Sequence, residues 1–473
     1  MRLKHMRVGA ALMGAALAML PAMPCSGAGE VTDYDDMGMY TVNDSYITFG
    51  YRDDGIVITE CRKEMKGDLV IPDELDGKPV IAIGEGAFYQ VTGLTSVTMP
   101  ETVTEIGPGA FYCCEALRSV NLPKGLTSIG ESAFYQCASL QSVQIPDGIT
   151  TITDSCFSLC YSLTELTFPK NLEVIEAQAF YGTGQMDELV IPDTVTDIGE
   201  LAFYYWNRIT TVTIPKSVRN MGDYVFDGCD ALTEIVVEDG NPAYCDVDGV
   251  LYDAEMKRLI KYPSAKNGES FSVPDGVTEL DGWAFVGASK LRSIELNDVE
   301  TFGNEAFYNC TSLEAITLPA NLEKLPDAAF TYCSSLREIV IPESCTAIGT
   351  YCFAGCTSLR EVAVPAGVTE IGDYAFGYDY DIETQTLSKL EDFRLRVLVG
   401  TVGMEYAKEF DVPYRSNSKL GLILGITAAV LVVAGITAGV LLHRRNTVRI
   451  ADGPNKGKPV AKQSRTNTKN GGK

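Results

Sequence analysis

Histidine is almost missing from this chain of 473 residues, which contains only His5 and His443. Both lie outside residues 29–419, the part that we expect to be exposed. A Ser/His/Asp triad, a Cys/His dyad and a histidine-ligated metal site are therefore excluded there. A carboxylate pair could hydrolyse a glycoside without histidine, but regular repeats favour a shallow surface over the pocket it needs. We expect no enzyme, no catalytic residue, no cofactor and no metal site.

Positive charge is also scarce. The chain has 38 Lys and Arg against 63 Asp and Glu, a net charge of −25. Twelve basic residues lie before residue 29 or after residue 442, so residues 29–419 carry 26 basic and 62 acidic side chains. Such a field repels phosphate and anionic lipid, which excludes nucleic acid as a partner. The charge suits solubility first, and then basic proteins or cation-bridged glycans.

The two ends of the chain predict export and membrane insertion. Basic residues at 2, 4 and 7 precede an apolar run over residues 8–20, which is too short for a comfortable span, so residues 1–28 predict a signal peptide. Residues 420–442 carry no charge and are long enough to cross a bilayer as one helix. The basic tail, residues 443–473, would then be cytoplasmic. The predicted localisation is the cell membrane, single-pass, with residues 29–419 outside.

An internal repeat of about 23 residues occupies most of the chain. Each unit reads roughly L-x-x-V-x-I-P-x-x-V-x-x-I-G-x-x-A-F-x-x-C-x-x. One unit cannot bury its apolar face alone, so neighbouring units must stack around a shared core. The same position holds phenylalanine in twelve units: Phe88, Phe111, Phe134, Phe157, Phe180, Phe203, Phe226, Phe285, Phe307, Phe330, Phe353 and Phe376.

Each unit predicts a strand followed by a helical return. Residues 94–100 alternate and end at Pro100, which cannot donate to a strand ladder. Val103, Ile106 and Phe111 then follow at the spacing of a helix. The predicted fold class is α/β: a solenoid with a single curved parallel sheet and short helical or 3₁₀ returns, plus one C-terminal transmembrane helix.

Glycine follows the isoleucine in eight units, at positions 84, 107, 130, 199, 222, 303, 349 and 372. Thr153, Asp281 and Pro326 stand at the same position in other units. Because the proline ring holds φ negative, a left-handed conformation cannot be the requirement. Threonine and aspartate suit a helix cap and proline a first helical turn, so we interpret the position as the start of a helix.

The cysteines do not form an obvious disulfide framework. Fourteen are present, and removal of Cys25 with the signal leaves an odd number. Seven stand three residues after a phenylalanine, where Val91, Thr183 and Ala288 stand in other units, as expected of a small buried hydrophobe. Stacked coils would bring the Cα atoms close but hold the Cβ vectors side by side. We therefore expect reduced thiols rather than disulfides or a metal site.

The Ile-Pro, Ile-Gly, Ala-Phe and Cys positions together resemble the BspA-type leucine-rich repeats of bacterial surface proteins, over roughly residues 55–416. Residues 249–252 and 259–263 are similar to a hairpin insertion of that family, and residues 400–407 to its closing segment. The resemblance implies a leucine-rich-repeat solenoid and adhesion to host or microbial surfaces. It brings no catalytic motif.

The repeat and its interruptions divide the chain into eight segments. They are a signal peptide (1–28), an N-terminal cap (29–68), repeats (69–237), a hairpin insertion (238–272), further repeats (273–389), a C-terminal cap and tether (390–419), the membrane span (420–442) and the cytoplasmic tail (443–473).

The candidate site is a stripe of glutamates on the outward side of the stacked strands, which we expect to bind a basic or Ca²⁺-bridged ligand. Asp246 and Asp248 before Gly249 resemble the start of a calcium loop but lack its third oxygen ligand and bidentate glutamate, so no calcium site is expected there. The predicted function is binding or adhesion to a protein or glycan at the cell surface. The alternative is a structural scaffold of the envelope, whose surface would be uniform. The stripe comprises Glu165, Glu188, Glu234, Glu338 and Glu361.

Overall fold

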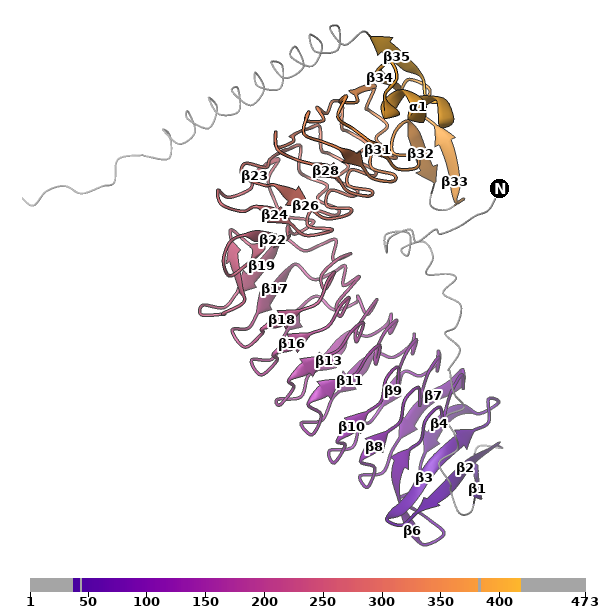
Figure 1. The fold of residues 1–473 in the computed structure, drawn as a ribbon. Helices are drawn as coiled ribbons and strands as arrows, with labels where there is room; N and C mark the ends of the chain where they lie inside the picture. The colour runs from indigo at the N-terminus through magenta and orange to yellow at the C-terminus, as the bar shows by residue number, and fades with distance from the viewer. Residues whose placement is uncertain (1–36, 43–44, 382–383, 418–473) are drawn as a thin grey trace, which may run out of the picture. The chain divides into compact units, whose positions relative to one another are not determined.

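The computed structural model describes residues 37–42, 45–381 and 384–417, which lie within one compact unit over residues 1–418. Coils of the chain stack side by side along this unit (Figure 1). The predicted signal peptide, the predicted membrane span over residues 420–442 and the basic tail lie outside the described residues. Within the described ranges, no helix has the length and apolar character needed to cross a bilayer.

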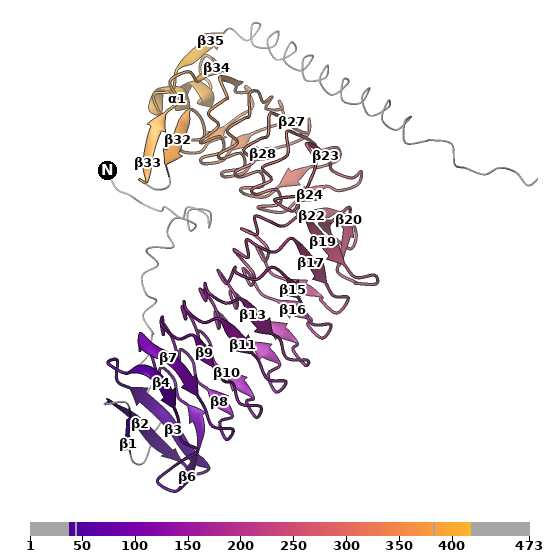
Figure 2. The ribbon, with the colours of Figure 1, turned by 180° about the vertical axis from the view of Figure 1, so that it is seen from behind.

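Most coils contribute two short strands, and these form two parallel columns along the stack (Figures 1 and 2). The first column contains β4 (Lys66–Val70), β7 (Gly93–Thr98), β9 (Ser119–Val120), β11 (Ser142–Gln144), β13 (Glu165–Thr167), β15 (Leu189–Val190), β17 (Thr211–Ile214), β19 (Glu234–Val237), β23 (Ser270–Ser272), β25 (Ser293–Glu295), β27 (Ala315–Thr317), β30 (Glu361–Ala363), β34 (Arg394–Leu398) and β35 (Tyr414–Asn417).

The second column lies later in each coil. It contains β6 (Lys78–Ile83), β8 (Glu105–Ile106), β10 (Ser128–Ile129), β12 (Thr151–Ile152), β14 (Val174–Ile175), β16 (Asp197–Ile198), β18 (Asn220–Met221), β22 (Arg258–Lys261), β24 (Glu279–Leu280), β26 (Thr301–Phe302), β28 (Lys324–Leu325), β29 (Ala347–Ile348) and β31 (Glu370–Ile371).

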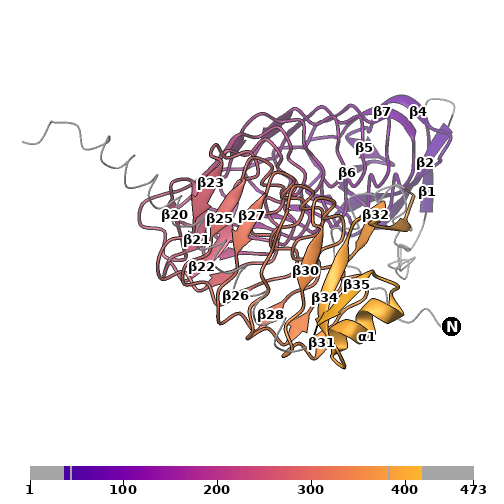
Figure 3. The ribbon, with the colours of Figure 1, turned by 90° about the horizontal axis from the view of Figure 1, so that it is seen from above.

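Antiparallel strands and one helix complete the unit. At the N-terminal end, β1 (Met37–Val42), β2 (Ser45–Arg52) and β3 (Gly55–Cys61) lead into β6, with β5 (Glu74–Leu75) paired to it. Two hairpins interrupt the coils, β20 (Tyr244–Val247) with β21 (Val250–Asp253) and β32 (Tyr378–Asp381) with β33 (Thr386–Lys389). At the C-terminal end, α1 (Val402–Glu409) lies beside β34 and β35 (Figure 3).

The expected α/β class with helical returns and a single sheet is wrong. The unit is a β-solenoid with two strand columns, and α1, after the last coil, is the only helix among its described residues. The returns are successive turns, because residues such as Gly109 (φ 57°) and Cys113 (φ 56°) are left-handed and stop a right-handed helix. Their neighbours pair between coils instead, as where Phe111 N donates to Ala133 O at 2.7 Å.

The interpretation of the glycine position as a helix start is wrong for the same reason. These glycines lie where one coil passes closest to the coil before it. A Cβ on Gly130 would lie 2.3 Å from Pro108 N, and one on Gly199 would lie 2.3 Å from Ala177 N. Glycine is needed here because it lacks a side chain, and the close approach lets Gly130 N donate to Ile106 O at 2.8 Å.

The second column breaks where this position holds Thr153 or Pro326. Thr153 replaces the backbone bond with its hydroxyl, which donates to Ile129 O at 3.0 Å, and β10 and β12 do not pair. Pro326 has no N–H to donate, and β26 and β28 do not pair. A groove of about 700 Å³ opens along the second of these breaks, beside Phe302 and Pro326.

The core is a spine of stacked phenylalanines. Ring centroids of successive coils lie 4.9 Å apart for Phe88 and Phe111 and 6.0 Å apart for Phe203 and Phe226. Each ring is almost fully buried, and such burial stabilises the fold by about 2–3 kcal/mol per side chain. The spine is not continuous, because the buried residues fall into two clusters, one ending at Leu251 and the other beginning at Val250.

Candidate binding surface and pocket

The five predicted glutamates lie in one column of the solenoid but do not form one continuous run. Glu165 stands opposite Ser142, and Glu234 stands opposite Thr211. The register of β15 with β17 places Glu188 opposite Thr211 as well. Further along, Ser293 and Ala315 occupy the column before Glu338 and Glu361 are reached. The stripe is therefore a group of three and a group of two, separated by uncharged residues.

The two groups differ in their surroundings. Glu165, Glu188 and Glu234 are exposed, and Glu234 lies against the β20–β21 turn, where a Cβ on Gly249 would come within 2.8 Å of its Cγ. Glu361 is instead half-buried and paired, because Arg394 Nε donates to it at 2.6 Å and Arg396 lies 3.4 Å away. Glu338 is exposed like the first three glutamates, whereas Glu361 is neutralised by its two arginines.

Arginines flank the second group. Arg292 Nη1 lies 2.7 Å from Glu314 Oε1, and Arg337 Nη2 lies 3.7 Å from Glu314 Oε2. These opposite charges lie close together and neutralise one another in the coils that precede Glu338. The outward side of the strands is therefore chemically uneven: three exposed glutamates precede the hairpin insertion, whereas after it Glu338 is exposed and Glu314 and Glu361 are ion-paired.

The insertion itself builds a hairpin on the first strand column. Asp248 (φ 52°) and Gly249 (φ 72°) form its two-residue turn, with both residues left-handed. The hairpin bonds to β19 through Ile235 N and Gly249 O, 3.0 Å apart, and through Val237 N and the Asp246 carboxylate, 2.8 Å apart. Asp246 and Asp248 thus have structural places, and the described ranges contain no group of three or more ligand side chains suited to a metal ion.

The insertion interrupts the backbone ladder between coils. Elsewhere three bonds join successive turns, for example from Leu201, Phe203 and Tyr205 to the carbonyls of the next coil. The corresponding N–H groups of Tyr224, Phe226 and Gly228 make no backbone hydrogen bond within the described part of the chain. Both strand columns also break here, between β19 and β23 and between β18 and β22.

Side chains replace the missing backbone bonds. Lys261 Nζ donates to the Asp227 carboxylate and to Trp283 O, the latter at 3.2 Å, and both charged side chains are at least 93% buried. Met221 N donates to the Tyr244 hydroxyl at 2.7 Å. These bonds bridge the coil that ends the first core cluster and the coil that begins the second.

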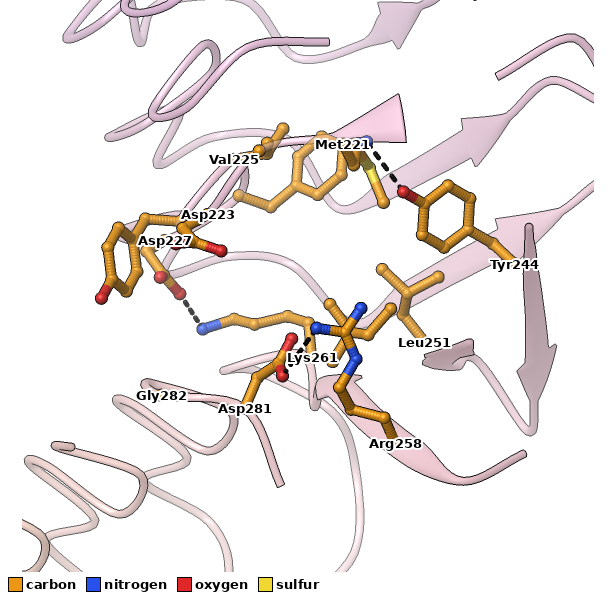
Figure 4. Close-up of a pocket in the computed structure, with 14 residues that line it drawn as sticks. Met221, Asp223, Val225, Asp227, Tyr244, Leu251, Arg258, Lys261, Asp281 and Gly282 are labelled. Carbon is orange, nitrogen blue, oxygen red and sulfur yellow. Dashed lines mark hydrogen bonds and ion pairs between the residues drawn. The ribbon is translucent and has the colours of Figure 1, made fainter. Parts of the chain in front are cut away.

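A pocket of about 260 Å³ lies at this junction, between the edges of β18 and β22 (Figure 4). Arg258 and Asp281 form an ion pair at 3.2 Å on one wall, and the buried Lys261–Asp227 pair forms another. Apolar parts of the wall come from Met221, Leu251 and Ile260, and the aromatic rings come from Tyr224, Phe226 and Tyr244.

Burial shifts the acids around this junction toward the protonated form. It raises the pKa of Asp281 to about 6, although Arg258 opposes the shift. It raises the pKa of Asp227 too, despite the Lys261 charge beside it. Behind the pocket, burial raises the pKa of Glu305 to about 7, and Asp227 and Asp327 add to the effect. Glu305 Oε2 is buried without a hydrogen-bond partner.

Sequence reasoning placed no functional residue in this pocket. The available signal was Lys261, which stands with Tyr262 where other units have Ala-Phe. Tyr262 keeps the pattern, because its N–H donates to Ala284 O at 2.8 Å and its ring stacks on Phe285. A lysine in a column of alanines therefore marked the place where the regular stack is interrupted.

Comparisons with known proteins agree on the repeat. The family model described as "BspA type Leucine rich repeat region" matches residues 81–209, 173–244 and 262–383, with six copies. This confirms the resemblance predicted from the repeat. No curated protein matches the chain.

Solved structures of bacterial proteins share the fold. A leucine rich cell surface protein from Faecalibacterium prausnitzii is 30% identical, with a TM-score of 0.63, over 78% of this chain and 97% of that one. The pneumococcal vaccine antigen PcpA is 22% identical, with a TM-score of 0.55, over 80% of this chain and 99% of that one. At its lower identity, the second likeness shows the fold alone.

Proposed function

Because the chain belongs to the BspA-type leucine-rich repeat proteins, we propose that it is a non-catalytic binding module of the cell surface, which recognises an extracellular protein or glycan. The observation that carries the proposal is the uneven outward side of the first strand column. A scaffold has no need of a chemically distinct patch, whereas a binder does. Glu165, Glu188 and Glu234 form such a patch, acidic and exposed, and Glu234 lies against the hairpin insertion.

The acidic patch suits a basic ligand or one bridged by Ca²⁺. Exposed carboxylates at this spacing attract cationic groups over several ångströms and raise the rate of encounter with a basic partner. Such an attraction weakens as salt increases, because exposed charges are screened. The second group, Glu338 and Glu361, contributes less in this proposal, since Arg394 and Arg396 already neutralise Glu361.

Binding of the purified full-length chain to a panel of matrix proteins, cell-wall polymers and glycans tests the proposal, with and without Ca²⁺. A saturable ligand should be lost in the variant Glu165→Gln/Glu188→Gln/Glu234→Gln. The matched control is Glu85→Gln/Glu131→Gln/Glu200→Gln, which removes the same charge from exposed turns elsewhere. Equal loss in both variants, or no ligand for a folded chain, would favour the scaffold.

The proposed localisation is the outer side of the cell membrane, with residues 29–419 outside. Its support is in the sequence: an apolar run at each end, and basic residues collected after residue 442. Labelling of intact cells with a membrane-impermeant amine reagent tests it. Lysines before residue 420 should react and those of the tail should not, and the reverse pattern would contradict this orientation.

A further inference from the structure

The pocket beside the hairpin insertion is a second candidate site, separate from the glutamate stripe. It exists because the insertion separates β18 from β22, so the backbone groups that join coils elsewhere do not meet here. At the coil boundaries on either side of the pocket, backbone hydrogen bonds join the two coils. The pocket is therefore a local consequence of residues 238–272 and not a property of the repeat.

Its walls hold polar groups with unused bonding capacity. The Asp223 carboxylate is exposed and makes no hydrogen bond or ion pair within the described ranges. Lys261 Nζ has three N–H groups and uses two, on Asp227 and Trp283 O. Arg258 uses Nη1 on Asp281, which leaves Nε and Nη2 free for a ligand. Donors and acceptors thus line one small space (Figure 4).

The charges of these groups restrict the ligand. A free cation would meet Arg258 and Lys261, and a free anion would meet Asp223 and Asp281. Each would gain one contact and suffer repulsion from the other pair. Hydroxyl groups can donate to a carboxylate and accept from a guanidinium or ammonium, so a neutral polyhydroxyl compound satisfies both kinds of wall.

The volume of the pocket and its apolar surface narrow the class of ligand further. At about 260 Å³ the pocket is smaller than the range of about 300–1,000 Å³ typical of drug-sized ligands. The apolar face of a sugar ring could pack on Met221 and Ile260, which are partly exposed, beside the Tyr244 ring that is held by its bond from Met221 N. The buried Lys261–Asp227 pair keeps the opposite wall in place, which lowers the cost of ordering the site.

We propose that this pocket binds one neutral pyranose unit of a glycan, through Asp223, Arg258 and Lys261. The proposal rests on the proposed surface-binding function for the source of the sugar. The pocket binds the sugar, and the acidic patch binds the protein part or the cation-bridged part of a ligand.

The test is a titration of the full-length chain with neutral methyl pyranosides, followed by calorimetry or by ligand-observed NMR. We expect saturable binding of at least one pyranoside, weakened at least fivefold in Asp223→Ala. Because Asp223 is exposed and unpaired, its loss should leave the fold intact. The matched control is Glu200→Ala, which changes the equivalent turn residue one coil earlier and outside the pocket.

Further arms of the experiment separate the possible failures. Binding of a methylamine or acetate probe but of no pyranoside would overturn the sugar assignment. Binding of a pyranoside that Asp223→Ala and Arg258→Gln leave unchanged, but that the triple glutamate variant abolishes, would overturn the pocket and retain the surface function. A glycan chain that binds while its monomer does not would also overturn the single-unit site. Absence of any ligand in this titration and in the surface panel would overturn both proposals.

Discussion

At the position three residues after each phenylalanine, the cysteine, threonine and tryptophan side chains all donate a hydrogen bond, whereas Val91 and Ala288 fill the position without a donor. Cys160 Sγ donates to Phe134 O at 3.3 Å, and other cysteines of the column bond to the preceding coil in the same way. Thr183 donates to Phe157 O, and Trp206 Nε1 donates to Phe180 O, both at 2.8 Å. The common partner is a buried carbonyl, which explains why cysteine alternates with threonine and even tryptophan.

Substitution of Cys160 by threonine or valine separates donation from packing. The two side chains have nearly the same shape, but only threonine can donate to Phe134 O. We expect Cys160→Val to be less stable than Cys160→Thr by about 0.5–1.5 kcal/mol, because it removes one of the two hydrogen bonds that the Phe134 carbonyl accepts, the other coming from Cys137 N at 3.2 Å. Urea unfolding of the two variants measures the difference. Equal stabilities would mean that the column is selected for size alone.

Glu305 is the buried acid whose ionisation should affect stability most directly. Burial raises its pKa from 4.5 to about 7, so the folded protein binds this proton more tightly than the unfolded chain does. The tighter binding of this proton stabilises the folded protein fully below the pKa that Glu305 has in the unfolded chain. This stabilisation is lost as pH rises through the pKa of Glu305 in the folded protein. Between pH 4.5 and 7, stability should therefore fall.

The variant Glu305→Gln removes this titration while keeping the shape. We expect it to flatten the stability profile between pH 5 and 7 and to be more stable than the parent at pH 8, by up to roughly 3 kcal/mol. Thermal unfolding at several pH values measures the effect. Exposed Glu131→Gln is the control, and a pH profile unaltered by Glu305→Gln would contradict the assignment.

At the scale of the coil, glycine sets how closely successive turns approach. Eight glycines stand where a Cβ would meet the backbone of the coil before, at 2.3–2.8 Å. None of the eight has the positive φ that usually explains a glycine at a fixed position of a repeat, so the requirement is steric. The close approach in turn allows the bond from the glycine N to the carbonyl of the last strand residue in the coil before, as from Gly130 N to Ile106 O.

Gly130→Ala should therefore destabilise the protein by about 1–3 kcal/mol or more, the cost of overpacking a close-packed site. Gly125→Ala is the matched control in the same coil, since its Cβ would lie 3.6 Å from Glu101 O and meet nothing closer. Chemical unfolding of both variants checks the prediction. If the two variants lost the same stability, close contact between coils would not be the reason for glycine at this position.

At the scale of the whole described unit, the hairpin insertion divides one stack into two. The buried residues form two clusters that meet near residues 250 and 251. In repeat proteins, stability is close to a sum of units and nearest-neighbour contacts. A boundary with an interrupted ladder and a buried ion pair in its place is a weak link in that sum.

We expect the two clusters to unfold at different urea concentrations, measured by hydrogen exchange of peptides from residues 94–209 and 285–376. Lys261→Met should separate them further, because it leaves Asp227 buried without a partner at a cost of about 3–5 kcal/mol. The double variant Lys261→Met/Asp227→Leu should recover most of that loss. A single transition shared by all peptides, in parent and variant alike, would show that the boundary is as strong as the others.

The sequence by itself determined the period of the coils, the phenylalanine spine and the place of the insertion, because these follow from which side chains must be buried. Val103, Ile106 and Phe111 are buried as expected. The same spacing suits a helix or successive turns, and only the tertiary structure decided for turns. The pattern reports burial but not the partners of the backbone N–H groups, which here bond between coils. The pocket was hidden for the same reason, since it forms where those bonds between coils are missing.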